Sequence, residues 1–322
     1  MTITAGVDIG GTKIAAAAVD ERGRMLAKVR RPTPATDLAA TVATIAEVLV
    51  DLRADHDVRA VGIGAPGFVD STRGLLRFAP NASWRDAPLA GLVASATGLP
   101  VDLENDANAA AWGEFVSGAG ADVDDQVLVT VGTGIGGGIV LGGRLLRGGF
   151  GIAGEIGHMR VVPGGRRCGC GQLGCWEAYA SGNAMTRRAQ EHAASGSAEG
   201  TLLREMAGGD AASITGQTVT AAALEGDPLA VDLLRETGRW VGEGVASMAA
   251  VLDPAAVVIG GGVSDAGNLL LDPVREAFHR HLSAGSHRPV AEIRRARLGN
   301  DAGIVGAADL ARLRVAETSP LS

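Results

Sequence analysis

The sequence predicts an α/β protein whose two lobes share a duplicated βββαβα core and enclose a cleft. Three observations favour this fold class. Strand-like and helix-like segments alternate along the 322 residues, a strand–Gly–Thr–strand unit occurs twice, and hydrophobic residues make up 46% of the chain. We expect a small α/β domain over residues 1–107 and a large one over 108–300. A C-terminal helix at about 301–322 is expected to pack back on the small domain.

The first copy of the βββαβα pattern opens with strands that are separated by glycine-containing turns. Pro34 and Thr36 or Asp37 suit a helix start, and the apolar residues that follow recur at spacings of three and four, as in an amphipathic helix. The sequence after the fourth strand is rich in turn residues to about Ser83. Strands are expected at Ile3–Ile9, Lys13–Asp20, Met25–Val29, Arg59–Gly64 and Pro100–Leu103, and further helices at Leu89–Thr97 and from Asp106.

The second cycle begins at Gln126. Asp227 and Pro228 are a good N-cap and first residue for a long helix that runs to about Leu252. Residues 193–216 are rich in Ala, Ser and Gly and are expected to be an insertion or a mobile region. Strands are expected at Val127–Val131, Ile135–Leu141 and Val257–Ile259, and a final helix around Ile304–Arg314.

Composition and charge exclude several classes of protein. The net charge of −7 argues against a broad nucleic-acid-binding face. The N-terminus shows no signal-peptide pattern, and the uncharged run from Gln126 to Gly143 contains seven glycines, which argues against a membrane span. We therefore expect a cytoplasmic protein that binds neither nucleic acid nor membranes. Only two of the 29 basic residues are lysines, Lys13 and Lys28, and we interpret the arginine excess mainly as codon bias.

Two glycine-containing hairpins are candidate phosphate-binding elements. Glycines let backbone N–H groups approach phosphate oxygens, Thr12 adds a hydroxyl, and Asp8 can hold a magnesium ion through water. A plain β-hairpin is the alternative for each motif taken alone. The candidate residues are Asp8, Gly10, Gly11, Thr12 and Lys13 in the first hairpin and Gly132, Thr133 and Gly134 in the second. Gly260, Gly261 and Gly262 follow a buried strand and form either a third nucleotide contact or a tight strand-to-helix turn.

The three cysteines of the chain, Cys168, Cys170 and Cys175, lie close together and follow His158. An odd number of cysteines at this spacing makes a poor disulfide framework. One imidazole and three thiolates form a tetrahedral set that suits zinc, and because no ligand position is left open, the zinc should be structural. The sequence therefore predicts a zinc loop over residues 158–175. The alternative is three free thiols and a surface histidine.

The two hairpins, in this order, resemble the phosphate-binding elements of the sugar-kinase and actin-like ATPase superfamily. The segment Glu155-Ile-Gly-His158 and the cysteine motif that ends Cys175-Trp-Glu177 resemble, more specifically, the ROK family (repressors, open reading frames and sugar kinases) and its bacterial ATP-dependent glucokinases. The resemblance covers essentially the whole chain. It implies the actin-like ATPase/hexokinase (ribonuclease H-like) fold. It also implies ATP-dependent phosphorylation of glucose at the 6-hydroxyl to glucose 6-phosphate, with Mg²⁺ and a structural Zn²⁺.

The segment Glu104-Asn105-Asp106 closes a strand and opens a helix, where Asp106 could be no more than an N-cap. In the family this segment is catalytic, so the resemblance implies that Asp106 is the general base for the sugar 6-hydroxyl. The resemblance further assigns sugar binding to Asn81, Asn105, Asp106, Glu155, His158, Glu177 and the backbone of Gly67. It also implies a homodimer or homotetramer.

Three alternatives compete with a glucokinase. Another ROK kinase would act on N-acetylglucosamine, N-acetylmannosamine or fructose, and the donor could be polyphosphate instead of ATP. A sugar-sensing ROK repressor would carry a DNA-binding segment before the first hairpin, and we expect none because Asp8 comes so early in the sequence. A zinc-scaffolded interaction module would not need Asp8, Asp106 and both Gly–Thr turns together.

Overall fold

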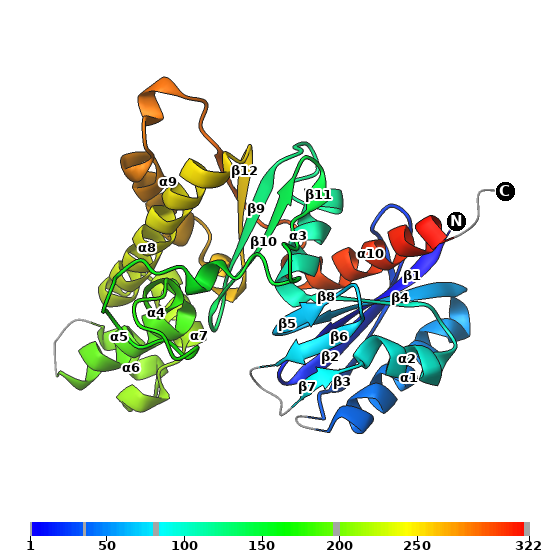
Figure 1. The fold of residues 1–322 in the computed structure, drawn as a ribbon. Coiled ribbons are helices and arrows are strands. Elements are labelled where there is room, and N and C mark those ends of the chain that lie inside the picture. Colours follow the sequence, from blue (N-terminus) through cyan, green and yellow to red (C-terminus); the bar gives the residue numbers. More distant parts are fainter. Residues whose placement is uncertain (1, 35–36, 80–83, 196–199, 319–322) are drawn as a thin grey trace. The chain divides into compact units, whose positions relative to one another are not determined.

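The computed structural model describes residues 2–34, 37–79, 84–195 and 200–318. The chain forms two compact units, drawn in Figure 1. The first consists of Met1–Asp124, Gly138–Gly154 and Arg297–Ser322, and the second of Asp125–Gly137 and Glu155–Ala296. The division that the sequence suggested between residues 107 and 108 falls inside the first unit, because the helix that begins there packs on the C-terminal helix of the same unit.

The first unit is built on a five-stranded sheet in the order β3-β2-β1-β4-β8. Its first three strands pair antiparallel, whereas β4 and β8 run parallel to β1. The predicted strands are confirmed as β1 (Ile3–Ile9), β2 (Lys13–Val19), β3 (Met25–Pro32), β4 (Val58–Ala65) and β8 (Val101–Asn105). Because the carboxyl ends of parallel strands meet at one edge, Asp8 on β1 and Asn105 on β8 lie toward the same edge of the sheet.

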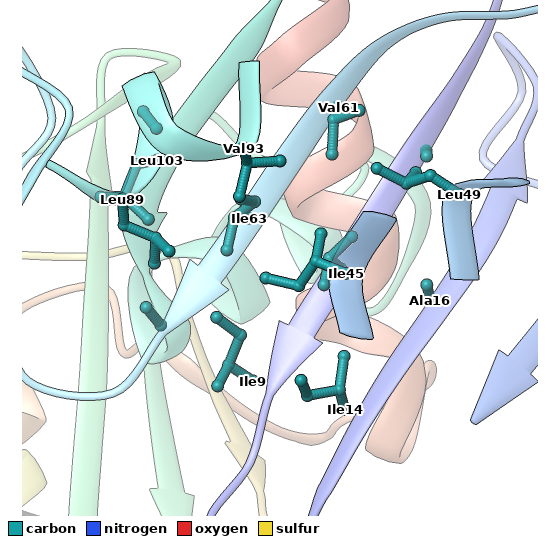
Figure 2. Packing of buried hydrophobic residues seen from close by; sticks show 14 of the residues in the cluster. Ile9, Ile14, Ala16, Ile45, Leu49, Val61, Ile63, Leu89, Val93 and Leu103 are labelled. Carbon is teal, nitrogen blue, oxygen red and sulfur yellow. The ribbon is translucent and has the colours of Figure 1, made fainter. Parts of the chain in front are cut away.

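Helices α1 (Leu38–Asp55) and α2 (Leu89–Thr97) cover one face of this sheet. Asp37 is the N-cap of α1, where its side chain accepts a hydrogen bond from the backbone N–H of Ala40. Apolar side chains of both helices pack against those of the strands in one fully buried cluster (Figure 2). Burying each such side chain contributes about 1.5–3 kcal/mol to folding.

Helices α3 (Asp106–Ser117) and α10 (Ala302–Thr318) lie on the opposite face. Their backbones approach closely: a Cβ at Gly62 would lie 1.8 Å from the carbonyl oxygen of Ala307, and one at Gly306 would lie 1.8 Å from that of Ala109. Only glycine fits at such contacts. A Cβ at Gly6, on the strand that carries Asp8, would likewise lie 1.9 Å from the Ile304 oxygen, so the first turns of α10 are held against β1, against β4 and against the helix that carries Asp106.

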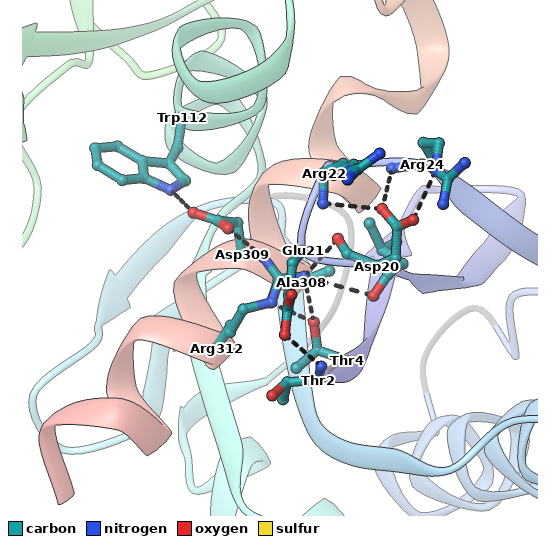
Figure 3. Close-up of polar contacts among 11 residues, drawn as sticks. Thr2, Thr4, Asp20, Glu21, Arg22, Arg24, Trp112, Ala308, Asp309 and Arg312 are labelled. Atoms are coloured by element: carbon teal, nitrogen blue, oxygen red, sulfur yellow. Dashed lines mark hydrogen bonds and ion pairs between the residues drawn. The ribbon is translucent and has the colours of Figure 1, made fainter.

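Polar contacts fix α10 further along its length (Figure 3). The Arg312 guanidinium donates to the backbone oxygen of Asp20 at 2.9 Å and to the Thr4 hydroxyl at 3.1 Å. Asp309, which pairs with Arg312, accepts a hydrogen bond from the Trp112 indole at 2.9 Å. This network joins α10 to β1, to the turn after β2 and to α3.

The second sheet has the order β11-β10-β9-β12-β13. When the five strands of each sheet are numbered in chain order, both sheets have the order 3-2-1-4-5. This shared order confirms the predicted duplication. Its strands are β9 (Gln126–Val131), β10 (Ile135–Leu141), β11 (Arg144–Leu145), β12 (Ala256–Gly260) and β13 (Glu292–Arg295). Among the described residues, no helix is long and apolar enough to cross a membrane.

The long helix α8 (Pro228–Leu252) packs along α9 (Asn268–His281) in the second unit. The predicted N-cap is confirmed, since the Asp227 side chain accepts from the backbone N–H of Ala230 at 2.9 Å. The shorter helices of this unit are α4 (Glu177–Ala180), α5 (Gly182–Ala194), α6 (Thr201–Met206) and α7 (Gly216–Leu224). Helix α6 lies within residues 193–216, where we expected an insertion or a mobile region, and α5 ends and α7 begins at the edges of this stretch.

The stretch before Ser83, which we expected to be rich in turns, contains a turn at residues 71–74 and also two short strands that we did not predict. A three-stranded sheet forms there from β5 (Phe68–Asp70), β6 (Leu75–Phe78) and β7 (Arg85–Ala87). These strands are too short for a clear alternation, and they are stabilised by packing: Leu76 is fully buried, and the rings of Phe68 and Phe78 lie 5.7 Å apart.

Candidate active site

The end of β1 places Asp8 among four other charged side chains of the first unit. Burial, followed by the charges of Asp106 and Asp301, raises the pKa of Asp8 to about 6, although the charges of Lys13 and Lys28 act to lower it. Gly303, at the start of α10, lies beside both acids: its Cβ would be 3.7 Å from Asp8 Oδ1 and 3.9 Å from the Asp106 backbone oxygen. A carboxylate beside lysines in this setting suits a magnesium ion and its phosphate ligands.

The first hairpin turns directly after Asp8. The backbone N–H of Gly10 donates to the oxygen of Lys13 at 2.9 Å, and the Thr33 hydroxyl donates to the oxygen of Gly10 at 2.7 Å. Gly11, Thr12 and Lys13 are exposed. The turn is thus fixed from within, and its tip is open to a ligand.

Asn105, and not Asp106, is the N-cap of α3. The Asn105 Oδ1 atom accepts from the backbone N–H of Asn108 at 3.0 Å, and its Nδ2 donates to the Gly67 backbone oxygen at 3.0 Å. Asp106 accepts from the adjacent Ala107 N–H at 2.8 Å, and burial raises the pKa of its carboxyl group even though this and other short-range hydrogen bonds act to lower it. Because capping is done by its neighbour, the Asp106 carboxylate is available for acid–base chemistry.

Glu104 is a buried charge that the sequence analysis did not single out. Its side chain is 2% exposed and pairs with the Arg147 guanidinium, with 2.6 Å between Oε2 and Nε. The other oxygen, Oε1, accepts from the Asn105 backbone N–H at 3.0 Å and from Asn108 Nδ2 at 3.1 Å. Glu104 therefore fixes the backbone directly before Asp106. Nothing in the sequence links Glu104 to an arginine 43 residues later.

We expect Arg147→Met to leave the Glu104 carboxylate buried without its cation. Breaking such a pair costs about 3–5 kcal/mol, and the loss of support at Asn105 should also lower turnover. Urea unfolding and steady-state kinetics measure the two effects. Arg144→Met, which removes an exposed arginine from the same segment, is the control and should change neither. Unaltered stability of Arg147→Met would contradict the structural role of the pair.

We expect Asp8→Asn to stabilise the protein above pH 6 when no magnesium is added. The folded chain holds the Asp8 proton up to about pH 6, whereas the ordinary carboxyl loses it near 3.8. Stability therefore falls as the pH rises through this window, and the buried charge costs about 3 kcal/mol at most above it. Urea unfolding from pH 4 to 8 should show a gain for the variant that disappears toward pH 4. Asp57→Asn, at an exposed site, should show no such gain; a less stable Asp8→Asn at pH 7.5 would refute the prediction.

The second hairpin lies in the second unit, where α5 holds it. The Gly132 backbone oxygen accepts from the Gly182 N–H at 2.8 Å, and the Thr133 oxygen accepts from the Asn183 N–H at 3.3 Å. Gly261 has φ +81°, and a Cβ there would lie 2.5 Å from the Val131 backbone oxygen. Packing alone thus accounts for Gly261, as in the tight-turn alternative. Gly260 ends β12, and no atom lies within 4 Å of a Cβ built at Gly262.

His158 and the three cysteines come together, with all their ligand atoms within 4.8 Å of one another. Cys170 Sγ lies 3.6 Å from Cys175 Sγ, and Cys168 Sγ lies 3.7 Å from His158 Nδ1. A tetrahedral zinc ion with ordinary bond lengths separates its ligands by about 3.3–3.8 Å, so both distances fit. The loop is tightly folded here, because a Cβ at Gly174 would lie 1.8 Å from the Val162 oxygen. The cluster is compatible with zinc.

Glu155 and Glu177, two of the predicted sugar-binding residues, lie next to this cluster. His158 Nε2 lies 3.8 Å from Glu155 Oε2, so its two ring nitrogens face Glu155 and the cysteines, respectively. Glu177 Oε1 accepts from the Cys168 thiol at 3.0 Å. Its other oxygen, Oε2, lies 2.6 Å from where a Cβ of Gly134 would be. Glu177 thus connects the cysteine cluster to the second hairpin. Asn81 lies outside the described residues.

The sequence matches the model of the ROK family over residues 4–314. The chain belongs to the ROK family. It is 50% identical over 312 residues to a glucokinase from Streptomyces coelicolor, covering 97% of this chain and 98% of that one. It is 36% identical over 320 residues to an N-acetylmannosamine kinase from Shigella flexneri, with 97% and 99% covered.

This ROK protein also resembles a solved structure, that of a ROK family glucokinase from Streptomyces griseus in complex with glucose and AMPPNP. The TM-score is 0.89 at 51% identity, and the match covers 97% of this chain and 99% of that one. The predicted α/β fold of the ROK sugar kinases is thereby confirmed.

Proposed function

We propose that this ROK protein is a glucokinase that transfers the γ-phosphoryl group of ATP to the 6-hydroxyl of glucose. The observation that carries the proposal is its similarity, over nearly the full length of both chains, to a glucokinase whose structure contains glucose and an ATP analogue. The glucokinase from Streptomyces coelicolor, at 50% identity, supports the same activity. The products are glucose 6-phosphate and ADP.

Asp106 is the general base of the proposed reaction. Its carboxylate takes the proton of the sugar 6-hydroxyl as the 6-oxygen bonds to the γ-phosphorus, and the bond from that phosphorus to the β–γ bridging oxygen breaks. Burial raises the pKa of Asp106, which brings its basicity closer to what proton transfer near neutral pH needs. Glu104 and Asn105 hold the backbone on either side in support of this role.

The sugar is held by carboxylate, imidazole and amide groups, since each hydroxyl both donates and accepts hydrogen bonds. Supporting evidence is the contact between Asn105 and the Gly67 backbone and the grouping of Glu155 with His158. The proposed sugar-binding residues are Asn81, Asn105, Asp106, Glu155, His158, Glu177 and the backbone of Gly67.

The nucleotide is held by the two hairpins. The exposure of Thr12 and Thr133 at the hairpin tips supports this assignment. When bound near Asp8, magnesium would supply positive charge to the β- and γ-phosphates. The proposed contacts are Asp8, Gly10, Gly11, Thr12, Lys13, Gly132, Thr133, Gly134, Gly260, Gly261 and Gly262. For Gly261 the close packing on Val131 is a sufficient explanation by itself.

Zinc is the metal that we propose for His158, Cys168, Cys170 and Cys175, in a structural role. Four protein ligands fill a tetrahedral site, so no position is open for catalysis. The two most buried ligands, Cys168 and Cys175, are 5% and 2% exposed, as expected for a site that stabilises a loop.

A sugar panel tests the proposed function. Wild-type protein with MgATP should phosphorylate glucose with a kcat/KM well above those for N-acetylmannosamine, N-acetylglucosamine and fructose. A preference for N-acetylmannosamine would favour the second candidate function, an N-acetylmannosamine kinase. The 36% identical kinase of that specificity is the observation that supports this candidate. Polyphosphate in place of ATP tests the donor, and no transfer to any hexose would refute the kinase. A cytoplasmic location and a homodimer or homotetramer stay predictions.

A further inference from the structure

The two lysines of the chain both act on Asp8. The other 27 basic residues are arginines, and the codon bias that explains this excess does not explain why positions 13 and 28 keep lysine. Lys13 follows the turn of the first hairpin, and Lys28 lies two strands away on β3. The charges of both lysines nevertheless reach the Asp8 carboxylate.

The register of the sheet explains how Lys28 reaches this position. Lys28 pairs with Ala17, and Asp8 pairs with Ala15, so both side chains stand on the sheet face toward which those alanines point. On that face Ala15 and Ala17 pack with Ile304 of α10. The neighbours of Lys28 in β3, Ala27 and Val29, instead pack against the core under α1.

Asp301, directly before α10, holds the Lys28 ammonium in an ion pair. The side chains are 23% and 27% exposed, so the pair is partly buried and partly open to solvent. Lys28 has three N–H donors, and one is bonded to Asp301. The pair therefore positions an ammonium group with remaining donors on the sheet face that also carries Asp8.

The local charge favours a further role for this ammonium. Three carboxylates, Asp8, Asp106 and Asp301, stand against two lysines, and a polyphosphate would add further negative charge. An ammonium is a compact charge with donors that can point in several directions, whereas a guanidinium is a wide, planar fork. A site between two carboxylates and a phosphate group favours the smaller cation. This is a physical reason for keeping lysine here in an arginine-rich chain.

We propose that Lys28, positioned by Asp301, is a binding residue for the phosphate groups of the nucleotide donor. The inference rests on the proposed kinase function. It goes beyond the hairpin contacts because it adds a residue from a different strand. A purely structural pair, which would only fasten β3 to the start of α10, is the competing explanation.

The test compares Lys28→Met, Lys28→Arg and Asp301→Asn with wild-type protein. MgATP binding is measured by calorimetry without sugar, and KM values for MgATP and glucose by kinetics. Loss of a charge-assisted contact should raise the Kd and the KM for MgATP about 10-fold or more in Lys28→Met, with the KM for glucose within about twofold. Lys28→Arg should not restore binding fully, and Asp301→Asn should show a smaller defect of the same kind.

Arg31→Lys is the matched control. Arg31 lies on the same strand but faces α1, where it pairs with Asp51 at 2.5 Å, so the swap should leave both constants unchanged. Wild-type MgATP affinity in Lys28→Met, or full binding by Lys28→Arg, would overturn the inference. A Lys28→Met variant with a lower melting temperature but unchanged MgATP binding would also overturn it. An inactive wild type would instead refute the kinase, while the calorimetry would still test Lys28.

Discussion

Asp106→Asn is expected to lower kcat by at least about 10²–10⁴ while glucose still binds, because the variant keeps the shape of the side chain and loses the base. The N-cap of α3 should survive, since Asn105 supplies it. Removing a carboxylate that is costly to bury should leave the protein as stable as wild type or more so. A coupled assay for ADP gives kcat, and fluorescence or calorimetric titration gives the affinity for glucose.

Asp102→Asn is the matched control for this experiment. Asp102 lies on β8 a few residues before Asp106, is 8% exposed and pairs with Arg314 at 2.5 Å, outside the proposed site. We expect this control to lose stability but to keep its kcat in the folded protein. Near-normal turnover of Asp106→Asn would remove Asp106 from its proposed role.

Cys170→Ser is expected to lose the bound metal and much of the stability of the second unit. Cys170 is an exposed ligand, so little apolar burial is lost and the effect reports on the metal. Metal binding and folding are coupled at such sites, and a loss of several kcal/mol should lower the melting temperature by about 10 °C or more. Metal content by mass spectrometry and melting by calorimetry measure both outcomes.

Gln172→Ser, in the same loop, is the control for Cys170→Ser. The Gln172 backbone oxygen, which accepts from the Cys168 N–H at 2.9 Å, is kept in this variant, so it should retain metal and stability. Wild-type protein that is purified without zinc and is fully active and stable would contradict the structural role. Sugar affinity should fall with the metal, because His158 belongs to both proposed sites.

Several parts of the proposed site could be predicted from the sequence because each depends on residues close together in the chain. The hairpin after Asp8 needs only two strands and a glycine turn, and the Cys168–Cys175 spacing by itself limits the chemistry to a metal cluster or free thiols. The confirmed strands and helices have the same origin, since their apolar periodicity and caps are local. The contacts of the sugar and the nucleotide stay predictions.

Other features depended on which distant segments pack together. The Arg147–Glu104 pair and the Lys28–Asp301 pair each join residues far apart in sequence. The choice of Asn105 over Asp106 as the helix cap is supported by Gly67, whose backbone oxygen fixes the Asn105 amide from the bend between β4 and β5.

The sequence by itself determined the family and the duplicated succession of strands and helices, and it predicted a metal site at the cysteine loop, because local patterns and residue spacing encode them. Only the tertiary structure decided which buried charges support Asp106 and how Lys28 is held on the same sheet face as Asp8. The reason is that α10 returns to the first sheet at Gly62 and packs on α3 at Gly306, through contacts that only glycine permits. That return sets Asp301 against Lys28 and Gly303 against Asp8, and no local pattern in the sequence specifies either contact.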